Sequence, residues 1–284
     1  MTPGGVPLVE ARGAVLVFGG CYSNLQATCA LLDEARRLGI PPERTICTGD
    51  VVAYGADAAA TVDVVRRAGV HVVMGNCEES LGGRAEDCGC GFTAGSACDR
   101  LSAAWYSHAD ASLGDEARAW MRSLPRRIDL LIGGRLLAVV HGSPDQVNAF
   151  VFGSTSDNDL RQLVRGAGCD GVIGGHCGIP FTRMVDGLLW HNSGAIGVPA
   201  NDGTPRVWFS VLEPDDASIE IRHLPLEYEH GAAAAAMRAA RLPDGYADAL
   251  SSGLWPSLDI LPPEELARTG QALATRTLLW PTTA

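Results

Sequence analysis

The stretch TICTGDVVAY, from Thr45 to Tyr54, joins a short apolar run to a glycine and an acidic residue. The apolar run Thr45-Ile46-Cys47 predicts a buried strand that ends at Gly49-Asp50. Open α/β sheets bind ligands outside the carboxyl ends of their strands, and a carboxylate at such an end is well placed to take part. We therefore take this stretch as the centre of the predicted fold and of the predicted site.

Apolar runs alternate with amphipathic segments on both sides of this stretch. Strands are predicted at 14–18, 45–47 and 70–74, and helices are predicted at 24–38 and 57–68, where apolar residues recur every three or four positions. Such alternation predicts βαβ units and a substantially parallel sheet. The chain is therefore assigned to the α/β class.

The second half of the chain carries a hairpin signal and further helices. Gly133-Gly134 separates two apolar runs, which predicts a hairpin. The run 181–212 predicts a β-meander with a tight turn at Asp186-Gly187. The remaining predicted elements are helices at 115–124, 157–165 and 232–240 and strands at 128–132, 136–140, 171–174 and 219–224.

A length of 284 residues allows one large domain, which we place at 14–256. Residues 1–13 are expected to form a disordered leader. Residues 81–113 form an insert that contains cysteines, and the Pro-rich residues 257–284 are expected to form an extended arm, with dimer packing as an alternative role. The arm is the reason to expect a homo-oligomer.

The charge balance excludes some classes of partner. The formal net charge is -11, whereas broad affinity for nucleic acid or for anionic membranes needs a positive surface. No run of 18 apolar residues is present, and no secretion signal is recognised, so a cytoplasmic protein with a small-molecule substrate is expected. Nine cysteines in such a setting argue against a disulfide framework.

Four more motifs place polar residues after predicted strands. They are GGCYSN at 19–24, GNCE at 75–78, VVHGSP at 139–144 and GGHCGIP at 174–180. Because strand ends meet at one edge of a sheet, we expect Asp50, Asn76, His141 and His176 to converge. One carboxylate, one amide oxygen and two imidazoles suit Mn, Fe, Zn or Ni. The sequence therefore predicts a divalent metal site.

These motifs resemble those of calcineurin-like metallophosphoesterases, most closely the small bacterial branch of that superfamily. The resemblance covers about 14–255 and implies a four-layer β-sandwich flanked by helices. It also implies a two-metal centre that hydrolyses phosphate mono- or diesters, with Asp50 bridging the metals and Asn76, His141 and His176 completing one of them. Cys77 stands where many relatives carry a general-acid histidine, so the resemblance makes Asp50, Cys77 and His141 the candidate catalytic residues.

The chain departs from the family pattern at the other metal. The family opens with Asp-x-His and ends with Gly-His-x-His, and here Gly20, Tyr22 and Gly178 occupy the ligand positions. Two of the three have no side chain that can bind, so a mononuclear or altered centre is predicted. One hypothesis rebuilds the second site from Cys21, Tyr22 and Cys177, because thiolates are soft ligands. The alternative makes both cysteines small buried residues and Tyr22 part of the wall.

Two further groups of residues are candidates for binding. The first group is expected to contact substrate or to orient the ligands, and consists of Asn24, Glu78, Asn192 and Ser193. The second group is the insert pattern C-x-C-x7-C, which is interpreted as a site for Zn or an Fe–S cluster or as a redox-active or structural loop over the active site, and consists of Cys88, Cys90 and Cys98.

Three functions remain open from the sequence. The first is a divergent metal-dependent phosphoesterase that works with a mononuclear or altered centre. The second is a repurposed mononuclear enzyme, with iron as a candidate metal, that runs redox or non-phosphate chemistry. The third is a non-catalytic binding protein on the same scaffold, which the four retained ligands argue against.

Overall fold

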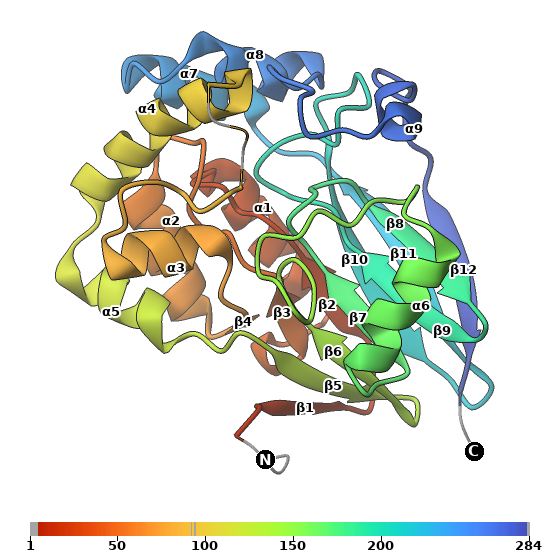
Figure 1. Cartoon of the computed structure of the whole chain (residues 1–284). Helices are drawn as coiled ribbons and strands as arrows, with labels where there is room; N and C mark the ends of the chain where they lie inside the picture. Colours follow the sequence, from red (N-terminus) through yellow and green to blue (C-terminus); the bar gives the residue numbers. More distant parts are fainter. Residues whose placement is uncertain (1–4, 92, 94, 283–284) are drawn as a thin grey trace.

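Two sheets packed face to face form the centre of the molecule, and helices cover both outer faces (Figure 1). The computed structural model describes residues 5–91, 93 and 95–282, and in this part of the chain each sheet has six strands. The strand order is β1-β5-β6-β7-β9-β8 in the first sheet and β12-β11-β10-β2-β3-β4 in the second. The predicted four-layer β-sandwich is confirmed.

The strands of the first sheet are β1 (Leu8–Ala11), β5 (Ile128–Ile132), β6 (Arg135–Val139), β7 (Gly171–Gly174), β8 (Phe181–Val185) and β9 (Leu188–Asn192). Those of the second sheet are β2 (Val15–Phe18), β3 (Thr45–Cys47), β4 (His71–Val72), β10 (Val207–Pro214), β11 (Ser218–Leu226) and β12 (Arg276–Pro281). The helices are α1 (Leu25–Arg37), α2 (Ala58–Ala68), α3 (Asn76–Gly83), α4 (Ala97–Ser112), α5 (Asp115–Ser123), α6 (Asp157–Gly166), α7 (His230–Ala239), α8 (Asp244–Ser252), α9 (Pro263–Leu266) and the 3₁₀ turn η1 (Pro42–Arg44).

Strand β2 explains how the layers form. All four of its residues are buried, and successive side chains of a strand point to opposite faces. Val15 and Val17 lie in the core between the two sheets, whereas Leu16 and Phe18 lie in the core under the helices. A strand buried on both faces is apolar throughout, which is why this segment carries no alternation of apolar and polar residues.

Both ends of the chain are more ordered than predicted. The disordered leader is wrong for residues 8–11, because Leu8–Ala11 form β1 and pair in parallel with β5. The C-terminal arm folds back onto its own chain, where Arg276–Pro281 form β12 at the edge of the second sheet beside β11. Edge strands depend on long-range pairing that a local pattern does not reveal.

Two internal predictions also need correction. Hairpins β5–β6 and β8–β9 form as expected, but β10 pairs with β2 and β11 in the other sheet, so 181–212 is not a single meander. Strand β4 is limited to His71–Val72, because the backbone then turns toward Gly75 and α3. Within the described residues, no helix is long and apolar enough to cross a membrane.

We predict that Trp280 holds β12 in place. Its side chain is fully buried in the core between the sheets, and its indole Nε1 donates to the carbonyl of Gly187 at 3.0 Å. Trp280→Ala should lower the free energy of unfolding by about 3–5 kcal/mol, as expected for a large core truncation. Leu279→Ala is the control, since that side chain is 60% exposed and should change stability by less than about 0.5 kcal/mol. Both free energies of unfolding are measured by urea unfolding, and an equal decrease in the two variants would contradict this assignment.

A buried histidine should make the protein less stable in acid. His223 bonds Thr182 Oγ1 at 2.7 Å and Ser210 Oγ at 3.1 Å, and burial, with a smaller contribution from Arg276, lowers its pKa to about 4. The folded state therefore binds fewer protons than the unfolded state between about pH 6.5 and 4, so stability falls as the pH drops through this window. His223→Gln should reduce this acid-induced decrease in the free energy of unfolding by at most about 3 kcal/mol. The free energies are measured by urea unfolding of the metal-free protein. Parallel pH profiles for the two proteins would exclude His223 as the cause.

Candidate metal centre

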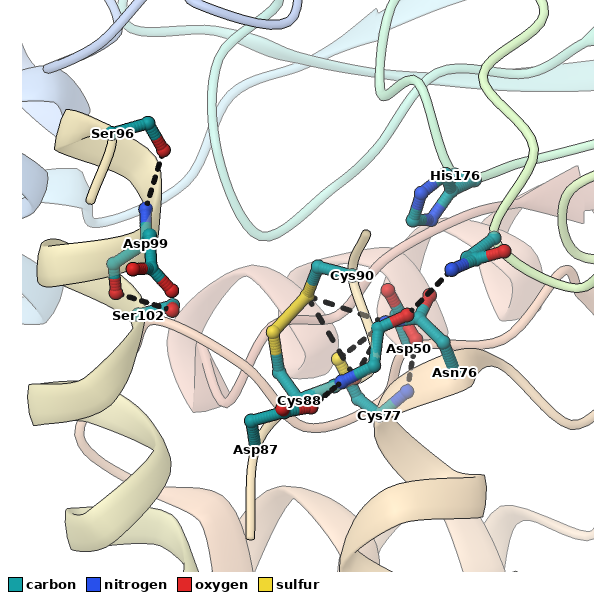
Figure 2. Close-up of a disulfide and its surroundings, with 12 residues drawn as sticks. Asp50, Asn76, Cys77, Asp87, Cys88, Cys90, Ser96, Asp99, Ser102 and His176 are labelled. Atoms are coloured by element: carbon teal, nitrogen blue, oxygen red, sulfur yellow. Dashed lines mark hydrogen bonds between the residues drawn. A yellow bond between two sulfur atoms is a disulfide. The ribbon is translucent and has the colours of Figure 1, made fainter. Parts of the chain in front are cut away.

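The predicted ligands come together where the two sheets meet. Asp50 follows β3 and Asn76 begins α3 just after β4, both from the second sheet, whereas His141 and His176 follow β6 and β7 of the first sheet. Figure 2 shows Asp50, Asn76 and His176 in one neighbourhood, close to the segment that contains Cys88 and Cys90. The carboxyl ends of strands from both sheets thus build one site.

His141 Nε2 lies at the middle of this cluster. It is 3.2 Å from Asp50 Oδ2, 3.1 Å from Asn76 Oδ1 and 3.0 Å from His176 Nδ1. Within the described residues, Asp50, His141 and His176 are the one group of His, Cys, Asp or Glu side chains whose donor atoms are close enough to share an ion. The four predicted ligands are therefore brought together.

The hydrogen-bonding pattern of the cluster fits a cation. His141 Nδ1 lies 2.7 Å from the carbonyl of Thr48, which only accepts, so Nδ1 carries a proton and the neutral form of the ring presents the Nε2 lone pair. Asn76 Nδ2 donates to the carbonyl of Cys88 at 2.9 Å, so Asn76 turns its Oδ1 inward. Lone pairs of Asn76, Asp50 and His141 then face one another, and a shared cation relieves their repulsion.

The backbone is strained at the residues of the site. Asp50 has a φ of 56° and His176 a φ of 54°, and Tyr22 and Ser23 lie at 49° and 57°. Non-glycine residues rarely adopt this left-handed region, which costs of order 1–3 kcal/mol each and is concentrated at functional sites. The surrounding fold therefore holds these side chains in place against their local preference.

A second set of groups fixes Asp50. Glu78 accepts from the backbone N–H of Asp50 at 2.7 Å and from that of Gly75 at 3.0 Å, and it is fully buried. The N–H of Cys77 donates to Asp50 Oδ1 at 3.1 Å. Such outer hydrogen bonds orient metal ligands.

Electrostatics couple His141 to the carboxylate beside it. Burial opposes protonation of the ring, but Asp50 outweighs burial and raises the pKa of His141, so a metal bound here would displace a proton from this imidazole. Burial opposes ionisation of Asp50, but the neighbouring His141 outweighs it and the pKa of Asp50 is lowered. Burial, with His141 beside it, lowers the pKa of His176 to about 3, so this imidazole stays neutral. His176 Nε2 is buried and has no hydrogen-bond partner within the described chain. A neutral imidazole and a carboxylate are the ligand forms that a divalent ion requires.

The predicted catalytic Cys77 lies behind the cluster. Its side chain is buried, and burial, followed by the nearby Asp50, raises the pKa of its thiol well above the usual range. Its sulfur is 3.6 Å from Asn76 Nδ2, and Cys77 does not line the cavity beside the metal ligands. A role for Cys77 as a proton donor stays a prediction.

The insert cysteines differ from the predicted metal site. Cys88 and Cys90 are joined by a disulfide, so they offer no thiolate, whereas Cys98 is a free thiol on α4. Metal binding by cysteine requires the thiolate. This pair is the one disulfide among the described residues, and the other seven cysteines are free thiols. The Cys88–Cys90 loop supports the cluster instead, through the hydrogen bond from Asn76 to the Cys88 carbonyl (Figure 2).

Tyr22 fills the space beside Gly20 and Gly178. A Cβ added to Gly20 would collide with the Tyr22 ring, and a Cβ at Gly178 would lie 3.8 Å from the Tyr22 hydroxyl. Cys21 and Cys177 are both buried, and the Cys177 sulfur accepts from Asn192 Nδ2 at 3.1 Å. Neither cysteine belongs to the described donor cluster, so ligand roles for them stay predictions.

The four predicted substrate contacts are tied to the protein itself. Asn24 caps α1 by accepting from the N–H of Ala27, Asn192 donates to the carbonyl of Gly175, and Ser193 is fully buried. Glu78, as described above, orients Asp50. None of the four lines the cavity beside the described metal ligands, so direct contact with substrate stays a prediction.

A cavity of about 70 Å³ opens onto Asp50 and His176. Its wall is aromatic, with Tyr54 and Phe150 from the first part of the chain and Tyr246 and Trp255 from the last part. Tyr54 stacks on Tyr246 with ring centroids 4.7 Å apart. Sequence reasoning missed these residues. Tyr54 stands within the GDVVAY motif, but Tyr246 and Trp255 arrive by long-range packing that leaves no local signal.

Comparisons with known proteins agree with this geometry. The family model described as the calcineurin-like phosphoesterase superfamily domain matches residues 15–216. An uncharacterized protein of Methanocaldococcus jannaschii is 26% identical over 259 residues, which cover 85% of this chain and 99% of that protein.

Two crystal structures share the fold. A metallophosphoesterase from Sphaerobacter thermophilus matches with a TM-score of 0.67 at 24% identity, and a hypothetical protein from Pyrococcus horikoshii matches with a TM-score of 0.72 at 18% identity. In both cases the match covers 85% of this chain and 99% of the other.

We predict that Gly75 is required for the position of Asp50. A Cβ at Gly75 would collide with Asp50 Oδ1 and would lie 2.6 Å from the Asp50 nitrogen, so Gly75→Ala should displace this ligand. Affinity for Mn²⁺, measured by calorimetric titration, should fall by about 10–100-fold, as it does when outer partners of metal ligands are lost. Gly83→Ala in the same helix is the control, because a Cβ there meets nothing within 4 Å. Equal affinities in the two variants would show that Gly75 does not set the ligand geometry.

Proposed function

Because the chain belongs to the calcineurin-like phosphoesterase superfamily and is a hydrolase of the phosphoesterase type, we propose that it cleaves a phosphate mono- or diester at a single divalent metal. Asp50, Asn76, His141 and His176 would hold this ion. The observation that carries the proposal is the convergence of three acceptor atoms on His141 Nε2 at 3.0–3.2 Å. A metal bound there supplies polarisation of a phosphoryl oxygen and activation of water.

Residues around the proposed metal ligands hold those ligands in position. Thr48 accepts the Nδ1 proton of His141, which fixes the tautomer and the direction of the ring. Glu78 and the N–H of Cys77 hold the Asp50 carboxylate from behind. The phenol ring of Tyr22 and the other aromatic side chains exclude water from the cavity face, which strengthens electrostatic interactions with a bound phosphoryl group.

The environment of Tyr22 supports one metal rather than two. Its ring covers the Cα of Gly20, and Gly178 beside it offers no ligand atom. Burial, followed by the nearby Asp50, raises the pKa of the Tyr22 hydroxyl well above its usual range, so this residue is a neutral phenol in the metal-free protein. Loss of a second ion should leave hydrolysis slower than in a two-metal site, since two ions clamp both the attacking and the leaving oxygen.

Metal content and activity test this proposal together. Protein purified with Mn²⁺ should hold about one ion per chain and release 4-nitrophenolate from nitrophenyl phosphate esters. His141→Ala should lose the ion, and its activity should fall by more than the roughly 10–100-fold expected when a hydrogen-bond partner of a metal ligand is removed. His71→Ala is the control, because His71 is a half-buried histidine of β4 outside the cluster.

The alternatives give different results. Two ions per chain would overturn the mononuclear centre and return Cys21, Tyr22 and Cys177 as ligand candidates. One ion without hydrolysis of any phosphate ester would overturn the phosphoesterase assignment of this site. Unchanged metal content in His141→Ala would show that the ion binds elsewhere.

A further inference from the structure

A second and larger cavity lies apart from the proposed metal ligands. Its volume is about 350 Å³, which falls within the roughly 300–1,000 Å³ of pockets that bind small molecules. The segment that joins α9 to β12, dark blue in Figure 1, lines it together with residues of β8, β10 and β11. None of the four proposed metal ligands lines this cavity. It is therefore a separate site, and the proposed function makes no use of it.

Much of the wall of this cavity is apolar. The Trp208 side chain is buried, and Phe181, Ile179 and Leu273 are half-buried around the same space. In ligand pockets, apolar and aromatic walls cover the body of the ligand, and a few placed polar groups fix its orientation. The cavity therefore suits a molecule with an apolar or aromatic body.

The two carboxylates in the wall are already engaged by the protein itself. Asp202 accepts from the backbone N–H of Leu273 at 3.0 Å, and Glu265 accepts from the backbone N–H of Ser154 at 2.8 Å. Both side chains are almost completely buried, with exposed fractions of 1% and 4%. These carboxylates thus hold the wall together, and they are poorly placed to attract a cation from solvent.

Arg276 brings an unpaired positive charge to this cavity. It stands opposite His223 in the β11–β12 ladder, and opposite residues of an antiparallel pair share one face of the sheet. Burial, with a smaller contribution from Arg276, lowers the pKa of His223 to about 4, so this neighbour is uncharged at neutral pH. Within residues 5–91, 93 and 95–282, the Arg276 guanidinium has neither a carboxylate partner nor a hydrogen-bond acceptor.

Arg268 adds a second guanidinium to the same cavity. Its side chain is 63% exposed, and its Nη1 lies 3.4 Å from Glu265, which leaves its other N–H groups available. A guanidinium presents five N–H donors in a planar fork that matches the oxygens of a carboxylate or a phosphate. The polar part of the cavity is thus suited to an oxyanion.

We propose that this cavity, which we call the Arg276 cavity, binds a small organic anion whose carboxylate or phosphate group contacts Arg276 and Arg268 and whose aromatic or apolar body packs on Trp208 and Phe181. Binding there requires no metal and does not rest on the proposed hydrolysis. The cavity also reaches the segment that follows the metal ligand His176, because Ile179 and Pro180 form part of its wall.

Three probes test the Arg276 cavity in the metal-free protein. They are 2-naphthoate, its neutral counterpart 2-naphthamide, and 2-naphthyl phosphate. Calorimetric titration should show one 2-naphthoate site per chain, and the amide should bind at least about tenfold more weakly, because it cannot form charge-assisted hydrogen bonds. The phosphate probe distinguishes the two oxyanions, since the anion that binds more tightly carries the group that the cavity prefers.

Two matched variants test the role of Arg276. Arg276→Gln should weaken 2-naphthoate binding by about tenfold and leave 2-naphthamide binding unchanged, and the exposed position of Arg276 makes loss of folding unexpected. Arg165→Gln is the control, because it removes the same charge from an exposed arginine at the end of α6, outside the cavity. This control should bind both probes as the wild-type protein does.

Hydrogen–deuterium exchange locates the bound anion. 2-Naphthoate should slow the exchange of backbone amides in residues 268–276 and leave those of residues 157–165 unchanged. The proposal is overturned if neither anion binds, if the acid and the amide bind equally, or if Arg276→Gln and Arg165→Gln have equal effects. It is also overturned if the protection lies outside residues that line the cavity. Each of these results would leave hydrolysis at the metal centre unaffected, because the protein is tested without metal.

Discussion

The hydrogen bond from His141 Nδ1 to the carbonyl of Thr48 joins the two sheets at the site. His141 follows β6 of the first sheet and Thr48 follows β3 of the second, so the bond spans 93 residues of sequence. It determines which nitrogen of His141 faces Asp50, Asn76 and His176. The ligand geometry therefore depends on how the two sheets are packed against each other, and the apolar core between them is also what positions the ligands.

The loops that carry the ligands hold strain for which the core compensates. Asp50 and His176 both lie in the left-handed region, and the hydrogen bonds of Glu78 to the backbone of Asp50 and Gly75 keep the first of these turns in place. A residue larger than glycine at Gly75 would displace Asp50, so the GN motif is a packing requirement as well as a source of the Asn76 ligand. Gly75, Asn76 and Glu78 thus determine both the local backbone conformation and the position of the metal-ligand side chains.

The sequence predicts the ligands better than it predicts the cavity. Asp50, Asn76, His141 and His176 each follow a short apolar strand, and the resemblance of their motifs to the family pattern, rather than their spacing, joins them in one predicted site. Strands β1 and β12 were not predicted, because edge pairing depends on partners more than 50 residues away in the sequence. Tyr246 and Trp255 were missed for the same reason. The pairing of Cys88 with Cys90 has no local signal that separates it from two free thiols.

The packing at Gly20, Tyr22 and Gly178 is coupled through one side chain. The Tyr22 ring occupies the space that any side chain at Gly20 would enter, and its hydroxyl lies beside Gly178. An aspartate at Gly20 is therefore incompatible with this position of Tyr22, and a ligand at Gly178 would point toward the phenol. The three positions therefore form one packing unit in the wall of the site, and a change at any of them requires the Tyr22 ring to move.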